Sequence, residues 1–209
     1  MGLTITIVDY GMGNLSSVKN AFDHIGVQST VTNKIDDLKN ARAICLPGVG
    51  AFGEAMTNLK NLNLVDELTY QVVHQKKPFL GICLGMQLIA ESSEENGLHK
   101  GLGWIDGKVL RIQTDAKLRL PHIGWNDLHF PRQSFLYEGM GPDKNFYFVH
   151  SYQMVCDPQW VTASCEYGGL VTASVQKENM VATQFHPEKS HANGMLVLRN
   201  FIKYATSLC

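Results

Sequence analysis

Short apolar runs alternate with helical patterns through the first half of the chain, and this alternation restricts the fold more than any other feature of the sequence. Four runs have the length and composition of strands: residues 4–10, 27–32, 41–47 and 78–83. Helical patterns lie between them, at residues 15–25, 51–62 and 63–75. Strands that alternate with helices favour a largely parallel sheet covered on both faces. Asn14 or Ser16 is the expected N-cap of the first helix.

The second half of the chain is mostly β in character. Its short segments are rich in β-branched and aromatic residues and cover residues 107–113, 126–130, 146–152, 161–167, 170–175 and 180–185. We expect them to add antiparallel strands, followed by a closing helix after Pro187. The 209 residues contain no repeat or low-complexity tract, so we expect one α/β domain over residues 1–209.

Charge and cysteine content argue against several classes of protein. The 18 basic and 19 acidic residues nearly cancel, so no charged footprint for nucleic acid or an anionic membrane is expected. No apolar run approaches the roughly 18 residues of a membrane span. The five cysteines are odd in number and form no CxxC pair, which argues against a disulfide framework and a zinc site. We expect a cytoplasmic protein without metal or cofactor, whose ligand is small or is another protein.

The segment GICLGMQ, residues 81–87, places a cysteine between two glycines where a strand is expected to end and a helix to begin. A nucleophile at such a turn needs a strained backbone, and Gly81 and Gly85 keep neighbouring side chains away from Cys83. The N-terminus of the following helix would favour the thiolate, and the N–H of Leu84 would stabilise an oxyanion. A buried core cysteine beside a tight turn fits this segment equally well.

The segment QFHPEKS, residues 184–190, offers that cysteine a base and a carboxylate. Pro187 favours extended backbone at His186, and residues two apart in a strand point to the same side. Glu188 would then bond one imidazole nitrogen and leave the other to take the thiol proton. Taken alone, such a tripeptide is more often a surface turn, but beside the cysteine turn it favours nucleophilic catalysis. No HExxH pattern or paired Cys/His spacing indicates a metal site.

Together the two segments resemble the class I glutamine amidotransferases. The nucleophile motif of that family is similar to GICLGMQ, and its His-x-Glu motif is similar to FHPEKS. The resemblance implies a three-layer, flavodoxin-like α/β fold and a catalytic triad at Cys83, His186 and Glu188. It also implies that the substrate is L-glutamine, which is hydrolysed to glutamate and ammonia through a glutamyl thioester.

Four further segments resemble one branch of that family, the glutaminase subunits of imidazole glycerol phosphate synthases. These segments are DYGMGNLSSVKNAF, LPGVGAFGEAM, PHIGWN and YFVHSY. Members of this branch pass ammonia to a separate synthase subunit, a (βα)₈ barrel, which forms imidazole glycerol phosphate in histidine biosynthesis. The resemblance therefore implies a heterodimer.

The resemblance also assigns roles to individual residues. Glutamine would be bound by Gly48, Gln87, Ser151 and Tyr152. The second oxyanion donor, beside Leu84, would be Val49 or Gly50. The face toward the synthase subunit would include Pro121, His122, Trp125, Asn126 and Lys189. A plain proline-glycine turn at residues 47–50 and an ordinary hairpin at residues 121–126 are the structural alternatives.

Other functions have fewer signs in the sequence. The Gly-Met-Gly after the first strand lacks the third glycine of a dinucleotide fingerprint, because Ser16 stands at that position. A cysteine hydrolase that acts by itself and a non-catalytic binding subunit are two alternatives, and the intact triad disfavours the second. A related subunit that feeds ammonia to a sugar-amidating synthetase in surface polysaccharide synthesis would have the same chemistry, and the sequence does not separate the two.

Overall fold

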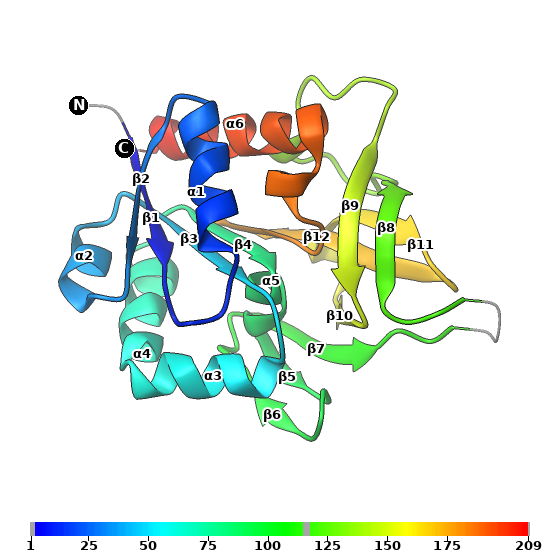
Figure 1. The fold of residues 1–209 in the computed structure, drawn as a ribbon, viewed down its shortest axis with the longest axis horizontal. Coiled ribbons are helices and arrows are strands. Elements are labelled where there is room, and N and C mark those ends of the chain that lie inside the picture. The colour runs from blue at the N-terminus through cyan, green and yellow to red at the C-terminus, as the bar shows by residue number, and fades with distance from the viewer. Residues whose placement is uncertain (1–2, 115–117, 209) are drawn as a thin grey trace.

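Seven strands form the central sheet of the molecule (Figure 1). They are β1 (Thr4–Val8), β2 (Gln28–Thr32), β3 (Ala43–Gly48), β4 (Phe79–Cys83), β11 (Val161–Glu166), β12 (Leu170–Lys177) and β13 (Met180–Thr183). Their order is β11-β12-β13-β4-β3-β1-β2. The structure is a computed structural model that describes residues 3–114 and 118–208.

Five of these strands are parallel, and they fix where a site can form. From the edge inward they run β2-β1-β3-β4-β13, the strand order of flavodoxin-like doubly wound sheets. Strands β12 and β11 continue the sheet in antiparallel fashion. The expected α/β fold, with a largely parallel sheet and added antiparallel strands, is confirmed. In such sheets ligands bind at the carboxyl ends of the parallel strands.

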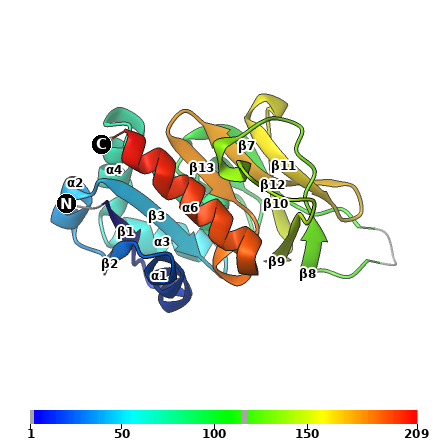
Figure 2. The same cartoon turned by 90° about the horizontal axis from the view of Figure 1, so that it is seen from above.

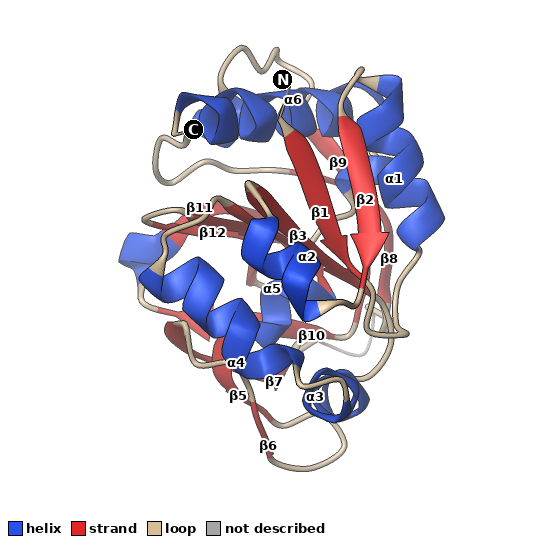
Figure 3. Ribbon diagram, turned by 90° about the vertical axis from the view of Figure 1, so that its left-hand side faces the viewer, coloured by secondary structure: helices blue, strands red, loops and turns tan. Residues whose placement is uncertain are grey.

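Helices cover both faces of the sheet (Figures 2 and 3). One face carries α1 (Leu15–His24) and α6 (His191–Ser207), and the other carries α2 (Ile35–Asn40), α3 (Phe52–Asn61), α4 (Leu64–Thr69) and α5 (Leu84–Leu88). Because side chains alternate along a strand, Ile5 and Ile7 pack toward α1 and α6, whereas Ile44 and Leu46 pack toward the other helices. Two buried cores result, one on each face.

Two smaller sheets extend these cores. Strands β10 (Tyr152–Cys156), β7 (Ile105–Arg111), β5 (Ala90–Ser93) and β6 (His99–Lys100) form one of them in that order. Strands β8 (His122–Asp127) and β9 (Asn145–His150) pair as an antiparallel ribbon. Short helical turns η1 (Tyr70–His74), η2 (Phe135–Tyr137), η3 (Pro158–Trp160) and η4 (Pro187–Lys189) complete the described structure. Among the described residues, no helix is long and apolar enough to cross a bilayer.

Several details differ from the sequence-based expectation. The strand expected at residues 126–130 is wrong, because β8 spans residues 122–127, earlier in the chain. The strand expected at residues 146–152 is two strands, β9 and β10, separated by Ser151. The helix expected over residues 63–75 ends in the π-helical turn η1. Of the two candidate caps of α1, Asn14 accepts the bond from the Ser17 N–H. Helix α2 and strands β5 and β6 were not expected.

Candidate functional site

Cys83 lies at the end of β4, at the carboxyl edge of the sheet, and α5 begins at the next residue. Its backbone has φ 54° and ψ −105°, in the region that favours glycine. Such a conformation costs about 1–3 kcal/mol and persists where the surroundings enforce it. A Cβ on Gly85 would collide with the carbonyl oxygen of Leu46, and one on Gly81 would lie 2.8 Å from the Gly85 carbonyl oxygen. Both flanking glycines therefore make the turn possible.

His186 and Glu188 follow β13, the strand beside β4. The imidazole Nδ1 lies 2.7 Å from Glu188 Oε1, and both side chains are 2 % exposed. The expected bond between His186 and Glu188 is present, but the expectation that both residues lie on one extended strand is wrong. His186 has extended backbone, as Pro187 favours, and the chain then turns into the 3₁₀ helix η4. The Ser190 hydroxyl donates to the His186 carbonyl oxygen at 2.6 Å and closes this turn.

The charges of this cluster favour a protonated His186. Burial lowers the pKa of His186, but the negative charges of Cys83 and Glu188 raise it by more, so the pKa lies above the usual range. His186 Nε2 is buried and makes no hydrogen bond of standard geometry with any described residue. That nitrogen is thus available for proton exchange with the thiol of Cys83.

A cavity of about 230 Å³ opens beside Cys83. It is smaller than the roughly 300–1,000 Å³ of pockets for drug-sized ligands, so it suits a small molecule such as an amino acid. Seven of the residues singled out in the sequence line it: Val49, Gly50, Cys83, Leu84, Gln87, Ser151 and Tyr152. Three lining residues were not anticipated: Glu95, Val149 and His150. Val149 and His150 belong to the segment YFVHSY and directly precede Ser151, so their position in the sequence could have suggested them. Glu95 has no such signal, because only tertiary contacts bring it here.

Gly48 does not line this cavity. A Cβ on Gly48 would collide with the hydroxyl of Tyr10, which is 1 % exposed, and would crowd the side chain of Leu84. Gly48 was expected to contact the substrate, but the structure indicates another reason for a glycine at this position. It leaves room for a buried tyrosine rather than for the substrate.

The backbone carbonyl groups at Ser151 and Tyr152 bond within the protein. The carbonyl oxygen of Tyr152 accepts from Gln87 Nε2 at 3.0 Å and from His150 Nδ1 at 2.8 Å. The carbonyl oxygen of Ser151 accepts from the Ile112 N–H at 3.0 Å. Ser151 and Tyr152 both line the cavity, and the Tyr152 carbonyl fixes the amide of Gln87.

His122 does not lie on the surface, in contrast to its expected place in a partner interface. It is 3 % exposed, and its ring stacks on Phe148 and Tyr167. His122 Nδ1 lies 3.0 Å from His150 Nε2, and Asn126 Nδ2 lies 3.2 Å from His122 Nε2. His150 Nδ1 faces a carbonyl oxygen and must therefore carry a hydrogen, which leaves His150 Nε2 to accept from His122 Nδ1–H and His122 Nε2 to accept from the Asn126 amide. This series of hydrogen bonds is satisfied with both rings neutral. Burial lowers the pKa of His122 to about 4 and that of His150 to about 3.

The other expected interface residues lie at or near the surface. Pro121 and Trp125 are exposed, and Trp125 stacks on His191 with ring centroids 4.9 Å apart. Asn126 is partly exposed. The ammonium of Lys189 lies 5.7 Å from the ring centroid of Tyr147.

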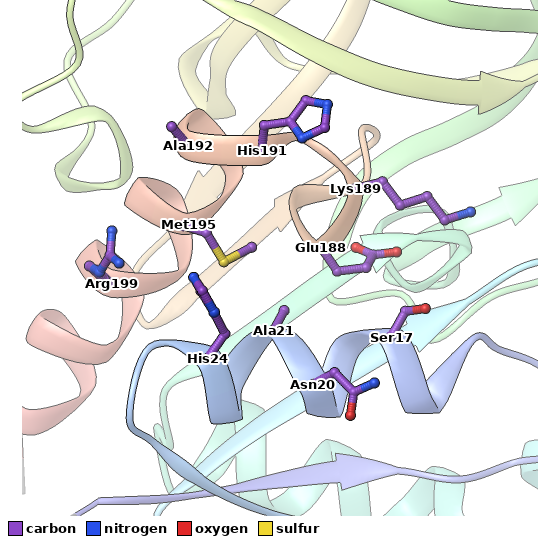
Figure 4. A pocket seen from close by; sticks show the side chains of 10 residues that line it. All are labelled: Ser17, Asn20, Ala21, His24, Glu188, Lys189, His191, Ala192, Met195 and Arg199. Atoms are coloured by element: carbon purple, nitrogen blue, oxygen red, sulfur yellow. The ribbon is translucent and has the colours of Figure 1, made fainter.

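A groove of about 750 Å³ runs between α1, α6 and η4 (Figure 4). Figure 4 shows Ser17 and His24 of α1 across from Arg199 of α6, with Glu188 and Lys189 at one end. Glu188 lines the groove, Cys83 does not, and Lys189 and Arg199 supply basic side chains. The groove is an open surface feature, separate from the small cavity beside the thiol.

Residues 3–114 and 118–208 contain no group of three His, Cys, Asp or Glu side chains arranged to hold an ion. The four cysteines within those ranges are free thiols, and Cys209 lies outside the described residues.

Comparisons with known proteins place the chain in a family. A family model described as glutamine amidotransferase class-I matches residues 6–204. Imidazole glycerol phosphate synthase subunit HisH 1 of Campylobacter jejuni (strain RM1221) is 47 % identical over 199 residues, which cover 95 % of this chain and 99 % of that protein. Imidazole glycerol phosphate synthase subunit HisH 2 of Vibrio vulnificus (strain YJ016) is 49 % identical over 203 residues, 97 % of this chain and 95 % of that protein.

Solved structures share the fold at lower sequence identity. A structure described as a glutamine amidotransferase superposes with a TM-score of 0.75 at 21 % identity and covers 96 % of this chain and 98 % of that one. The structure of PurLQS from Thermotoga maritima superposes with a TM-score of 0.74 at 18 % identity, over 98 % and 99 % of the two chains. These likenesses concern the fold.

Proposed function

The chain belongs to the class I glutamine amidotransferases, and from that premise we propose that it is the glutaminase subunit of an imidazole glycerol phosphate synthase. Two relatives that are 47 % and 49 % identical over nearly the whole chain carry that name. The observation that carries the chemical part of the proposal is the strained Cys83 at a strand end, beside a buried His186–Glu188 pair. In this function residues 1–209 act as one amidotransferase domain in the cytoplasm.

The first half of the reaction forms a thioester. Glutamine lies in the cavity with its side-chain amide against Cys83, and His186 holds the thiol proton. The thiolate attacks the amide carbon, and the N–H of Leu84 with that of Val49 or Gly50 stabilises the oxyanion. His186 then gives its proton to the leaving nitrogen, so that ammonia departs and a glutamyl thioester remains on the sulfur.

The second half of the reaction regenerates the enzyme. His186, now neutral, takes a proton from a water molecule, which attacks the thioester carbon. The carbon–sulfur bond breaks, and the sulfur leaves as the thiolate beside the protonated imidazole. Glutamate is released. Glu188 remains a carboxylate throughout, because its task is to hold the Nδ1–H tautomer and to stabilise the positive ring.

Glu95 adds a recognition element to the cavity. Its Oε2 accepts from the Phe52 N–H at 2.7 Å, which orients the carboxylate at the start of α3. A carboxylate on the wall of a small cavity pairs with the α-ammonium group of an amino acid. Glu95 would thus select the amino acid, while Gln87 faces its side chain.

The partner is the synthase subunit, a (βα)₈ barrel, and the heterodimer contact uses the β8 face and the neighbouring η4. Trp125 is 45 % exposed and Ile123 is 59 % exposed, which gives this face an apolar centre. A tryptophan of this kind suits an interface anchor. Lys189 and the basic groove of Figure 4 lie beside the same face, so an acidic rim on the partner fits them.

The proposal is tested by separating the two sources of ammonia. In the complex with the synthase subunit, Cys83→Ala loses glutamine-dependent synthesis by about 10⁴-fold or more, in line with other triad deletions. Synthesis from added ammonium salt persists, because the synthase subunit is intact. If the variant keeps normal glutaminase activity, Cys83 is not the nucleophile.

A second measurement tests the ammonia acceptor. Purified synthase subunit is added, and glutamate and imidazole glycerol phosphate are followed together. Both products rise on mixing if this subunit serves histidine biosynthesis. Glutamate without imidazole glycerol phosphate would assign the ammonia to another acceptor, such as a sugar-amidating synthetase. The names of the two relatives do not favour that acceptor.

A further inference from the structure

Gln184 is a fully buried amide beside the nucleophile, and the mechanism above gives it no task. Its exposed fraction is 0 %, and it lies between the end of β13 and His186. Its Nε2 lies 3.7 Å from the sulfur of Cys83. Its Oε1 lies 3.0 Å from Gln87 Nε2.

The orientation of this amide follows from its neighbours. A backbone carbonyl oxygen can only accept, so the group that Gln87 turns toward the Tyr152 carbonyl must be its NH₂. The same NH₂ contacts Gln184, which must therefore present its oxygen there. The Gln184 NH₂ is left facing the sulfur of Cys83. The reverse orientation would put two NH₂ groups against each other and an oxygen against the sulfur.

The two polar neighbours of the sulfur favour opposite protonation states. The carbonyl oxygen of Val149 lies 4.0 Å from the sulfur and can accept only from the thiol S–H. The Gln184 NH₂ is a donor and interacts most strongly with the thiolate. Cys83 is 6 % exposed, so water contributes little and a protein donor matters more.

We propose that Gln184 is a catalytic residue that donates a hydrogen bond to the Cys83 sulfur and stabilises the thiolate, with Gln87 and the Tyr152 carbonyl fixing the donor. This inference rests on the proposed glutaminase function. It assigns Gln87 a second task besides facing the substrate, since Gln87 sets the orientation of Gln184. A hydrogen bond to a charged group corresponds to about a tenfold effect or more on an equilibrium.

The test measures the thiolate directly, without glutamine. Gln184→Met keeps the length of the side chain and removes the donor. The rate of Cys83 alkylation by iodoacetamide is followed against pH by mass spectrometry of the Cys83 peptide. We expect the midpoint of the profile to move up by about one pH unit and the rate at a fixed pH below both midpoints to fall about tenfold. In glutamine turnover, kcat falls by a similar factor while KM changes little.

Two further variants keep the test decisive. Gln71→Met removes a buried glutamine that is 5 % exposed and bonds Glu67, away from the sulfur, and it leaves the alkylation profile unchanged. Gln184→Glu retains the acceptor for Gln87 but turns an oxygen to the sulfur, so its midpoint also moves up. The inference is overturned if folded Gln184→Met or Gln184→Glu protein has the profile of the native chain. If the variants shift the alkylation profile but the native protein releases no glutamate, the inference about Gln184 stands and the proposed glutaminase function is refuted.

Discussion

The buried pair His122 and His150 makes the stability of this protein sensitive to mild acid. Burial holds the pKa of His122 at about 4 and that of His150 at about 3, against 6.5 for an unfolded histidine. Below pH 6.5 the unfolded chain therefore binds protons that the folded chain does not, and stability falls as pH falls. The free energy of unfolding keeps falling with pH until the two rings also become protonated in the folded state.

The size of the effect follows from the distance between the pH and the unfolded pKa. At pH 5 the pH lies about 1.5 units below the unfolded pKa, so each ring that stays neutral in the folded state lowers the free energy of unfolding by about 2 kcal/mol. The two rings together lower it by at most about 4 kcal/mol. The whole free energy of unfolding of a domain is about 5–15 kcal/mol. His186 does not offset this loss, because its raised pKa keeps its stabilising contribution constant below pH 6.5.

Urea unfolding at pH 7 and pH 5 measures this loss. We expect the native chain to lose up to about 4 kcal/mol, and His150→Gln to lose about 2 kcal/mol or less over the same interval. His129→Gln is the matched control, because His129 is exposed and its strand contacts are made by the backbone. Equal stability of the native chain at the two pH values, or an undiminished loss in His150→Gln, would refute the neutral pair.

Three further predictions concern the site, its packing and the partner face. Glu188→Gln removes the charge beside His186 and lowers kcat by about 10²–10⁴-fold in a glutamate-release assay; unchanged kcat would contradict the role of the carboxylate. Gly48→Ala forces a Cβ against the Tyr10 hydroxyl and lowers the free energy of unfolding by about 1–3 kcal/mol, and adding Tyr10→Phe recovers part of it. Trp125→Ala weakens binding of the synthase subunit about tenfold or more in calorimetric titration. Unchanged affinity would contradict the assignment of β8 to the interface.

The parts of the site that depend on local backbone geometry could be predicted from the sequence. Cys83 between two glycines requires a strained turn, and the structure has that turn. The contact of His186 with Glu188 was expected for a partly wrong reason. Pro187 does extend the backbone before it, but Ser190 bonds the His186 carbonyl oxygen and bends the chain into a 3₁₀ turn, which a two-residue alternation does not include.

The parts that depend on distant contacts could not be predicted. Gln184 and Glu95 are ordinary polar residues in the sequence, and only the packing of β13 and the start of α3 against the cavity gives them partners. His122 was expected in the partner interface because it belongs to PHIGWN, a segment that resembles the partner-facing segment of the family. Residues in a strand alternate between faces, and this alternation buries His122 while Trp125 remains exposed.

Labelling with a glutamine analogue that carries an electrophilic chloroketone in place of the amide tests the central claim most directly. We predict one adduct, on the sulfur of Cys83, whose growth parallels the loss of glutamate release and is slowed by free glutamine. Inactivation with the adduct on another residue, or full labelling of Cys83 with glutamate release intact, would contradict it.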